Sequence, residues 1–247
     1  MELQGKVALV TGGGTGLGRA ISWGLAQAGM RVAINYSKSQ TDAEQTAAEL
    51  TTLGSEAVTV QADVANAVQV TDMVQTVYRH FGRLDVLIAN SGTTVFHPFE
   101  ALDAVSEEDW DLIMSVNVKG VWLCAKAAAP YLKASGAGRI VVVTSIAGLR
   151  STGSSLPYSV SKAAANHLTR GLAHALAPEV LVNAIAPGLL DTRWAHGHNP
   201  QTIDGFLASS PLHRVPTLAD CTLQVLTFLR SDSMTGTVVP VDAGMVL

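Results

Sequence analysis

The feature that most constrains the fold is a regular alternation of short apolar runs and helical stretches. The first apolar run, 6–10, ends in a glycine-rich turn, 11–18. A helical pattern and a second apolar run, 31–36, follow directly. A strand, a turn, a helix and a second strand within about 30 residues have the size of one βαβ unit.

The same alternation continues to the C-terminus. We expect further helices over 41–53, 67–81, 106–134, the stretch that carries Tyr158, and 218–230, and further strands over 57–60, 84–89, 139–144, 180–185 and 236–241. Several strands are apolar throughout, so helices should cover both faces of the sheet. No linker or change of composition divides the chain. We therefore expect an α/β fold: a single-domain Rossmann-type doubly wound parallel sheet of about seven strands flanked by helices, spanning 1–247.

The glycine turn is a candidate phosphate-binding site, because open parallel sheets bind ligands beyond the carboxyl ends of their strands. Gly12, Gly16 and Gly18 do not have the G-x-G-x-x-G spacing. They can still let the backbone approach a pyrophosphate, whose charge the N–H groups of the next helix would meet. The alternative is a plain glycine-rich turn.

The end of the second strand bears on the choice of cofactor. NAD-binding proteins usually carry an acid about 20 residues past the glycines, for the ribose 2′-hydroxyl. Here Asn35-Tyr36-Ser37-Lys38 holds that place without a carboxylate. A cation there can pair with a 2′-phosphate, which favours NADP(H), with NAD(H) as second choice. The alternative is that Lys38 is a solvated loop lysine.

Tyr158 and Lys162 are a candidate catalytic pair. They lie four residues apart at the start of an Ala-rich helix, so their side chains share one face. An ammonium beside a phenol lowers the tyrosine pKa from about 10, and such a phenol can exchange a proton with a carbonyl or hydroxyl. By itself the pair also fits an exposed lysine beside a half-buried tyrosine.

Further polar and glycine residues follow the ends of the later strands. They are Asp63-Val64, Asn90-Ser91-Gly92, Ser145, Pro187-Gly188 and Thr192. Asn117 interrupts an apolar helical stretch, where a buried amide needs partners and can bend the helix.

Taken in order, these motifs resemble the classical short-chain dehydrogenase/reductase family, most closely its 3-oxoacyl-carrier-protein-reductase-like members. The resemblance runs from Lys6 to Gly244 and also includes Asn183 and the ending Val241-Asp242-Ala243-Gly244. Three positions depart from the family pattern. Asn90-Ser91-Gly92 replaces Asn-Ala-Gly, Asp-Ala-Gly replaces Asp-Gly-Gly, and Thr15 stands where many NADP-using members have arginine.

The resemblance implies hydride transfer between a nicotinamide and a carbonyl or secondary alcohol. It makes Tyr158 the general acid or base, while Lys162 tunes the phenol and binds the nicotinamide ribose. Ser145 would donate to the substrate oxygen, and Asn117 would hold a relay water. The expected cofactor-binding residues are Gly12, Gly14, Thr15, Gly16, Leu17, Gly18, Asn35, Tyr36, Ser37, Lys38, Asp63, Val64, Asn90, Ser91, Gly92, Tyr158, Lys162, Pro187, Gly188, Leu190 and Thr192.

The substrate pocket is expected beneath a lid at about 189–215, which carries Trp194, His196, His198 and Phe206. The loop 93–105 adds His97 and Phe99. Together they suggest an aromatic wall for a medium-sized, fairly apolar ketone or alcohol. His196-x-His198 is not a helical ligand spacing and no carboxylates converge on it, so we expect no metal site.

Composition indicates which partners and which cellular compartment to expect. A net charge of −4 without a basic cluster does not suit nucleic acid. No signal peptide is recognisable, and no apolar stretch approaches the roughly 20 residues of a membrane span. Two distant cysteines suit a reduced, cytoplasmic setting. The resemblance, with the small residues of the Tyr158 helix, implies a homotetramer.

Three functions remain open at this point. The first is an NADP-dependent ketoreductase for a β-ketoacyl thioester or a similar ketone. The second is an NAD-dependent alcohol or sugar dehydrogenase of the same fold. The third is a non-catalytic dinucleotide-binding regulator, which would have no need of Asn117, Ser145, Tyr158 and Lys162.

Overall fold

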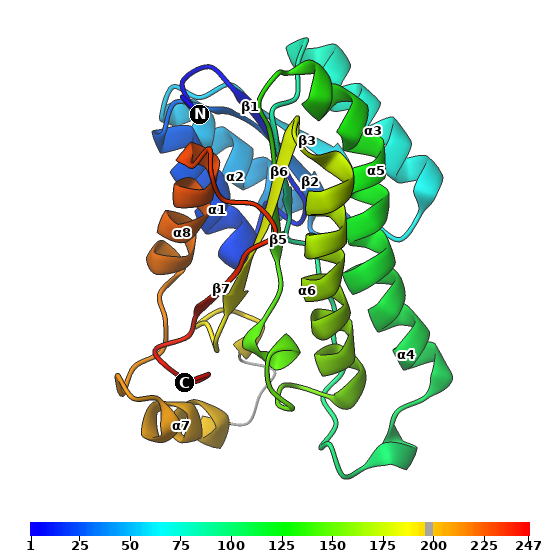
Figure 1. The fold of residues 1–247 in the computed structure, drawn as a ribbon, viewed down its shortest axis with the longest axis vertical. Helices are drawn as coiled ribbons and strands as arrows, with labels where there is room; N and C mark the ends of the chain where they lie inside the picture. Colours follow the sequence, from blue (N-terminus) through cyan, green and yellow to red (C-terminus); the bar gives the residue numbers. More distant parts are fainter. Residues whose placement is uncertain (196–199) are drawn as a thin grey trace.

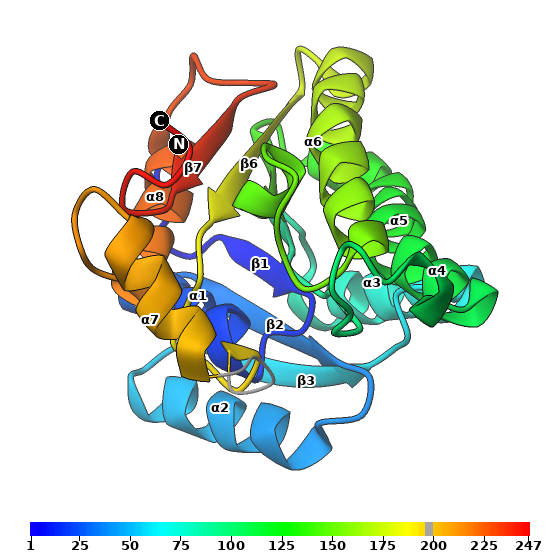
Figure 2. The ribbon, with the colours of Figure 1, turned by 90° about the horizontal axis from the view of Figure 1, so that it is seen from below.

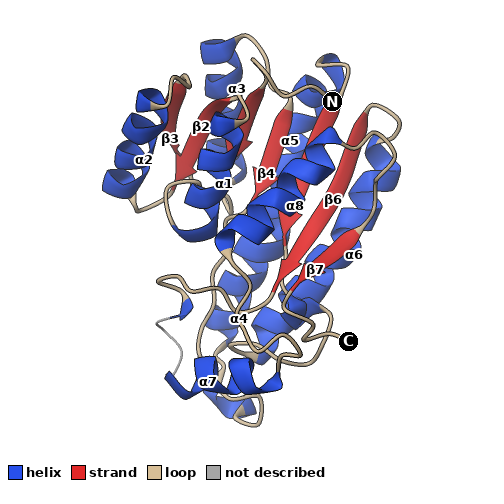
Figure 3. Ribbon diagram, turned by 90° about the vertical axis from the view of Figure 1, so that its left-hand side faces the viewer, coloured by secondary structure: helices blue, strands red, loops and turns tan. Residues whose placement is uncertain are grey.

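The seven strands form one parallel sheet in the order β3-β2-β1-β4-β5-β6-β7 (Figure 3). A computed structural model describes residues 1–195 and 200–247 of the chain. The strands are β1 (Val7–Val10), β2 (Arg31–Tyr36), β3 (Ala57–Gln61), β4 (Val86–Ala89), β5 (Gly138–Val143), β6 (Val180–Pro187) and β7 (Val238–Val241). This confirms the predicted doubly wound sheet, whose order reverses between β1 and β4.

Helices cover both faces of the sheet, as the apolar strands predicted (Figures 1 and 2). One face carries α1 (Gly16–Gln27), α2 (Gln40–Thr52) and α8 (Leu218–Arg230), and the other carries α3 (Ala67–Phe81), α5 (Gly120–Ala134) and α6 (Leu156–Leu176). Each layer buries its own apolar cluster against the sheet. The sheet is therefore shielded from water except at its edges and strand ends, and a ligand must enter at the strand ends.

The carboxyl ends of the strands are covered by extra elements. Figure 1 shows α7 (Pro200–Ser209) beyond these ends, close to the C-terminus, and α4 (Glu107–Met114) below α5. The short helices η1 (Leu102–Ala104) and η3 (Ile146–Gly148) complete this end. The sequence reading did not foresee α7, because its residues lie within a segment expected only as a lid.

The predicted helix over 106–134 is continuous but changes its winding at Asn117. A π-helical turn, η2 (Ser115–Lys119), separates α4 from α5. π turns are rare and often occur at functional sites. At the N-terminus of α4, the Ser106 hydroxyl accepts from the Asp109 N–H (3.1 Å). At the start of α8, Thr217 and Asp220 form a complete capping box.

The same 107–134 helix changes one expectation about membranes. By length and composition alone it could cross a membrane, with a mean hydropathy of 1.3 over its most apolar window. The sequence predicted no apolar stretch of that length, and residues 107–134 contradict this expectation. Of that window, 44% is buried inside the protein, and α5 packs against α3, β4 and β5. One such helix is weak evidence for a span, since the core helix of a soluble protein passes the same test.

Candidate active site

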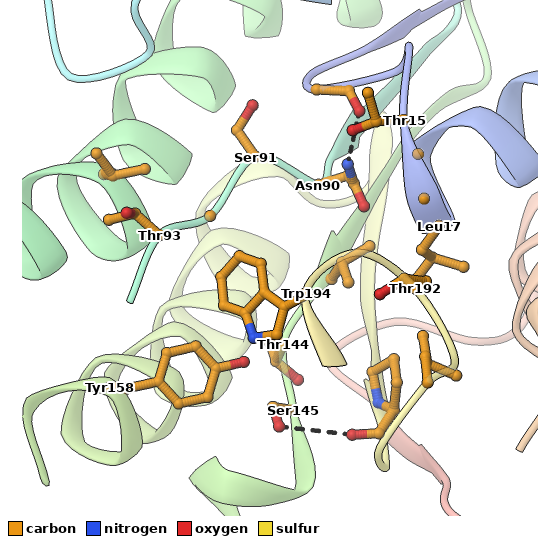
Figure 4. A pocket seen from close by; sticks show the side chains of 18 of the residues that line it. Thr15, Leu17, Asn90, Ser91, Thr93, Thr144, Ser145, Tyr158, Thr192 and Trp194 are labelled. Carbon is orange, nitrogen blue, oxygen red and sulfur yellow. Dashed lines mark hydrogen bonds between the residues drawn. The ribbon is translucent and has the colours of Figure 1, made fainter. Parts of the chain in front are cut away.

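A cavity of about 880 Å³ opens at the carboxyl ends of the strands (Figure 4). Every residue predicted to bind cofactor lines it, together with Ser145. The predicted catalytic residue that does not line it is Asn117, which lies behind the wall. The parallel sheet therefore brings motifs that are far apart in the sequence together on the wall of one cavity.

The glycine turn forms a close-packed cradle at one end of the cavity. A Cβ on Gly18 would lie 2.1 Å from the Gly12 carbonyl oxygen, and one on Gly14 would lie 2.7 Å from Ala43 Cα. Gly12 and Gly16 also have positive φ angles, +60° and +50°, which favour glycine. Asn90 fixes the turn from β4, because its Nδ2 donates to the carbonyl oxygens of Thr11 (2.9 Å) and Gly12 (3.2 Å).

Two helix N-termini facing this cavity have no side-chain cap. The N-cap residues are Thr15 of α1 and Ser39 of α2, and neither side chain bonds to its helix. In contrast, α3, α4, α6 and α8 are capped by the side chains of Asn66, Ser106, Ser155 and Thr217. Uncapped N–H groups at a helix start attract anions. The cavity can therefore receive negative charge at two places, the α1 turn and the start of α2.

Asn35 supports the cradle instead of facing a ribose. Its side chain is buried, with Oδ1 accepting from the Gly12 N–H (3.3 Å) and Nδ2 donating to the Ala62 carbonyl oxygen (3.0 Å). Its amide is thus occupied by backbone groups of two loops. The exposed residues at this end of the cavity are Ser37, Lys38, Ser39 and Asp63.

Tyr158 enters the cavity from the first turn of α6. Ser155 caps this helix by accepting from the Tyr158 N–H (3.4 Å), and Pro157 suits a first turn that needs no N–H donor. Burial raises the pKa of the phenol to about 12, and a hydrogen bond with Ser145 works in the opposite direction. The sequence predicted a net lowering of this pKa, which is wrong, because burial outweighs the opposing influences. The phenol is held in its protonated form.

Lys162 lies behind the tyrosine and is only 5% exposed. Its Nζ donates to the Val143 carbonyl oxygen (3.0 Å) and lies 5.6 Å from the centre of the Tyr158 ring. Burial lowers its pKa to about 8. The lysine therefore remains mostly protonated at neutral pH and loses its charge in mildly alkaline solution.

Asn117 fastens the loop after β4 to α6. Its Oδ1 accepts from the Thr93 N–H (2.8 Å), while Nδ2 donates to the Thr93 carbonyl oxygen (3.0 Å) and to Ser161 Oγ (3.0 Å). The resemblance implied that Asn117 holds a relay water, and this stays a prediction. Its side-chain atoms bond to protein groups and so fix the walls of the cavity. Thr93 and Ser161 were not foreseen; nothing in their local sequence marks them as partners of an asparagine on another helix.

The substrate side of the cavity is partly as expected. Trp194 and Phe206 line it, joined by Met245 near the C-terminus, but His97 and Phe99 do not. His196 and His198 lie outside the described residues. Among 1–195 and 200–247, no three side chains of His, Cys, Asp or Glu are grouped as metal ligands would be.

Comparisons with known proteins agree with this site. A family model described as short chain dehydrogenase matches residues 6–202. The chain is 40% identical over 243 residues to a Streptomyces violaceoruber protein named as a ketoacyl reductase of the granaticin polyketide synthase, covering 98% of this chain and 96% of the relative. It is 36% identical over 246 residues to a 3-oxoacyl-[acyl-carrier-protein] reductase of Synechocystis, covering 99% and 98%.

A solved structure gives the same result in three dimensions. A short chain dehydrogenase from Burkholderia cenocepacia, in complex with NADP, superposes with a TM-score of 0.92 at 34% identity, covering 100% of both chains. The chain therefore belongs to the short-chain dehydrogenase family and is an oxidoreductase that acts on CH–OH or C=O groups.

Proposed function

We propose that this short-chain dehydrogenase is an NADP(H)-dependent ketoreductase for a β-ketoacyl thioester or a similar ketone. One observation carries the proposal. Ser145, Tyr158 and Lys162 line one end of a single cavity, and the glycine cradle with two uncapped helix N-termini lines the other. A proton donor and a candidate dinucleotide site thus share one cavity.

The cradle fits a nicotinamide dinucleotide. Bound NADP(H) supplies or accepts the hydride, which no side chain of the protein can do. The backbone at Gly12, Gly16 and Gly18 would hold the pyrophosphate against the start of α1, with Asn90 keeping the turn in shape. Lys162 and Tyr158 would hold the nicotinamide ribose at the other end.

The proton chemistry follows from the burial of Tyr158. With a pKa of about 12, the phenol is protonated at neutral pH and can act as the general acid when a ketone is reduced. Ser145 is placed to donate to the same substrate oxygen and to steady its developing negative charge. The nearby Lys162 ammonium stabilises the phenolate left after proton transfer.

The start of α2 supports NADP(H) over NAD(H). Ser37, Lys38 and Ser39 precede an uncapped helix N-terminus, and residues 35–38 carry no carboxylate that would repel a 2′-phosphate. The carboxylate of Asp42, in the first turn of α2, is paired with Arg193 at 3.1 Å. An NADP-bound family member supports the same preference.

The test is a cofactor and substrate panel on the intact protein. We expect NADPH consumption with an acetoacetyl thioester and with simple ketones, and a lower KM for NADPH than for NADH. Equal or reversed KM values would refute the argument from the start of α2. Preferential NAD-linked oxidation of alcohols or sugars would support the second function. Tight cofactor binding without turnover of any ketone would support a regulator.

Three broader features belong to the same proposal. The chain acts as one domain over 1–247, with 189–215 as the substrate lid, and assembles as a homotetramer. Exposed apolar side chains on the helical face, among them Leu112, Trp122 and Val160, support the assembly. Two buried free cysteines, Cys124 and Cys221, suit a cytoplasmic setting. A monomer mass in light scattering would contradict the tetramer.

A further inference from the structure

Three consecutive side chains tie the segment after β6 to three separate elements. Thr192 lies against the glycine turn, because a Cβ on Gly16 would be 3.6 Å from its Cγ2 atom. Arg193 Nη2 reaches Asp42 Oδ2 of α2 at 3.1 Å. The Trp194 indole lies beside the Tyr158 ring of α6, with ring centres 5.9 Å apart and planes at 49°. We call residues 192–194 the strap.

Trp194 occupies the space next to the reacting phenol. Its Cη2 atom would be 3.9 Å from a Cβ on Gly92, and that same Cβ would be 3.6 Å from Lys162 Nζ. Figure 4 shows the indole between Tyr158 and the loop that carries Ser91 and Thr93. The side chain is still 39% exposed, so one face of the ring remains available to a ligand.

A second loop also lies against the Tyr158 ring. A Cβ on Gly153 would lie 3.3 Å from Tyr158 Cδ1, and Gly153 has a φ of +123°. The Gly153 backbone and the Trp194 indole thus both lie beside the Tyr158 ring. Because Trp194 lines the same cavity as Tyr158 and Ser145, a ketone that reaches their hydroxyl groups has the indole within reach of its body.

We propose that Trp194 is a specificity-determining residue that selects ketones with a flat aromatic or fused-ring body. This inference rests on the proposed ketoreductase function and narrows its substrate class. Aromatic rings gain from offset or tilted packing against an indole beyond the area they bury, whereas a flexible alkyl chain gains only from burial and loses rotational freedom. The preference should amount to about tenfold in kcat/KM.

The two other residues of the strap act as positioning residues for the indole. The Arg193–Asp42 pair is largely exposed, at 67% and 41%, so its contribution to overall stability is small. Its consequence is local: it fixes the strap to α2 next to the aromatic side chain. Loss of this pair should therefore reduce selectivity without removing turnover.

The experiment compares two ketones with equal numbers of carbon atoms, β-tetralone and methyl octyl ketone. The measured quantity is the ratio of their kcat/KM values with NADPH. We expect Trp194→Leu to lower this ratio about tenfold and Trp194→Phe to retain most of it. Arg193→Gln should lower it partially. Trp110→Leu, on α4, is the matched control, because Trp110 is 39% exposed like Trp194 but does not line the cavity; it should leave the ratio unchanged.

Two kinetic results would overturn the inference. In one, Trp194→Leu leaves the ratio unchanged or lowers both kcat/KM values equally. In the other, β-tetralone turnover rises, which would make the indole a steric barrier.

The binding constant of β-naphthol, a flat ligand that needs no turnover, separates this inference from the proposed function. Trp194→Leu should weaken that binding about tenfold. If β-naphthol binds equally to the wild type and to Trp194→Leu, the role of Trp194 is refuted. If it binds more tightly to the wild type but no ketone is turned over, only the proposed ketoreductase function is refuted.

Discussion

Replacing Lys162 by methionine would measure the free energy that the protein spends on burying this ammonium group. Burial lowers the lysine pKa from 10.5 to about 8. At about 1.4 kcal/mol per pKa unit, this shift destabilises the folded state by about 3 kcal/mol at neutral pH. Methionine removes that penalty but leaves the Val143 carbonyl oxygen without its donor, which costs about 1 kcal/mol. The variant should therefore be about 2 kcal/mol more stable at pH 7.

The dependence on pH gives the sharper test. Because the folded pKa lies below the unfolded one, the folded state binds fewer protons between pH 8 and 10.5, and the wild type regains stability as the pH rises through this window. Between pH 7 and pH 9 the difference between variant and wild type should shrink by about 1.4 kcal/mol. Tyr158 does not titrate in that range, since its pKa is raised to about 12.

Urea unfolding at both pH values and at one protein concentration provides the measurement. Lys119→Met, at an exposed position of η2, is the matched control and should give a difference that does not change with pH. If the Lys162→Met difference were also independent of pH, the lysine would not be buried as an ammonium. Lys162 could then not be the positively charged group that stabilises the Tyr158 phenolate.

Three further predictions concern activity. Tyr158→Phe should lower kcat for ketone reduction by about 10²- to 10⁴-fold, while NADPH, followed by its fluorescence, still binds. Near-wild-type turnover would show that Tyr158 is not the general acid. In the wild type, the rate of ketone reduction should decline above about pH 8, where Lys162 loses its proton. The rate of alcohol oxidation should instead rise with pH, because oxidation needs the phenolate. A reduction rate that stays constant up to pH 10 would contradict the role of the lysine. Lys38→Gln should raise the KM for NADPH about tenfold and leave the KM for NADH unchanged, since only NADPH carries the 2′-phosphate. Equal changes in both KM values would show that Lys38 does not bind the 2′-phosphate.

The sequence predicted those parts of the site that depend on strand ends. Apolar runs and glycine turns place Ser145, the glycine cradle and Tyr158 at one edge of a parallel sheet, and this placement needs no knowledge of side-chain packing. The expected starts of the helices at 106 and 218 agree with the structure to within one residue, because the caps at Ser106 and Thr217 are local interactions.

The contacts that cross between elements could not be predicted in the same way. Asn35 and Asn117 were recognised as unusual, but whether an amide faces a ligand or a backbone loop depends on which loops lie beside it. The pKa of Tyr158 was misjudged for a related reason. The spacing to Lys162 reveals a neighbouring charge, whereas the extent of burial that dominates the shift emerges only when helix, strand and loop are assembled. The pairing of Arg193 with Asp42 joins residues that are distant in sequence and has no local signal.

The central claim is that one cavity joins a dinucleotide cradle to a protonated Tyr158, so that hydride and proton reach the same carbonyl. The most direct test supplies the wild type with NADPH deuterated at the transferable position of the nicotinamide, together with an acetoacetyl thioester or β-tetralone, and analyses the product by mass spectrometry. We predict an alcohol with one deuterium on the former carbonyl carbon, formed by the wild type and nearly absent with Tyr158→Phe. An alcohol without deuterium, or equal yields from both proteins, would contradict the account.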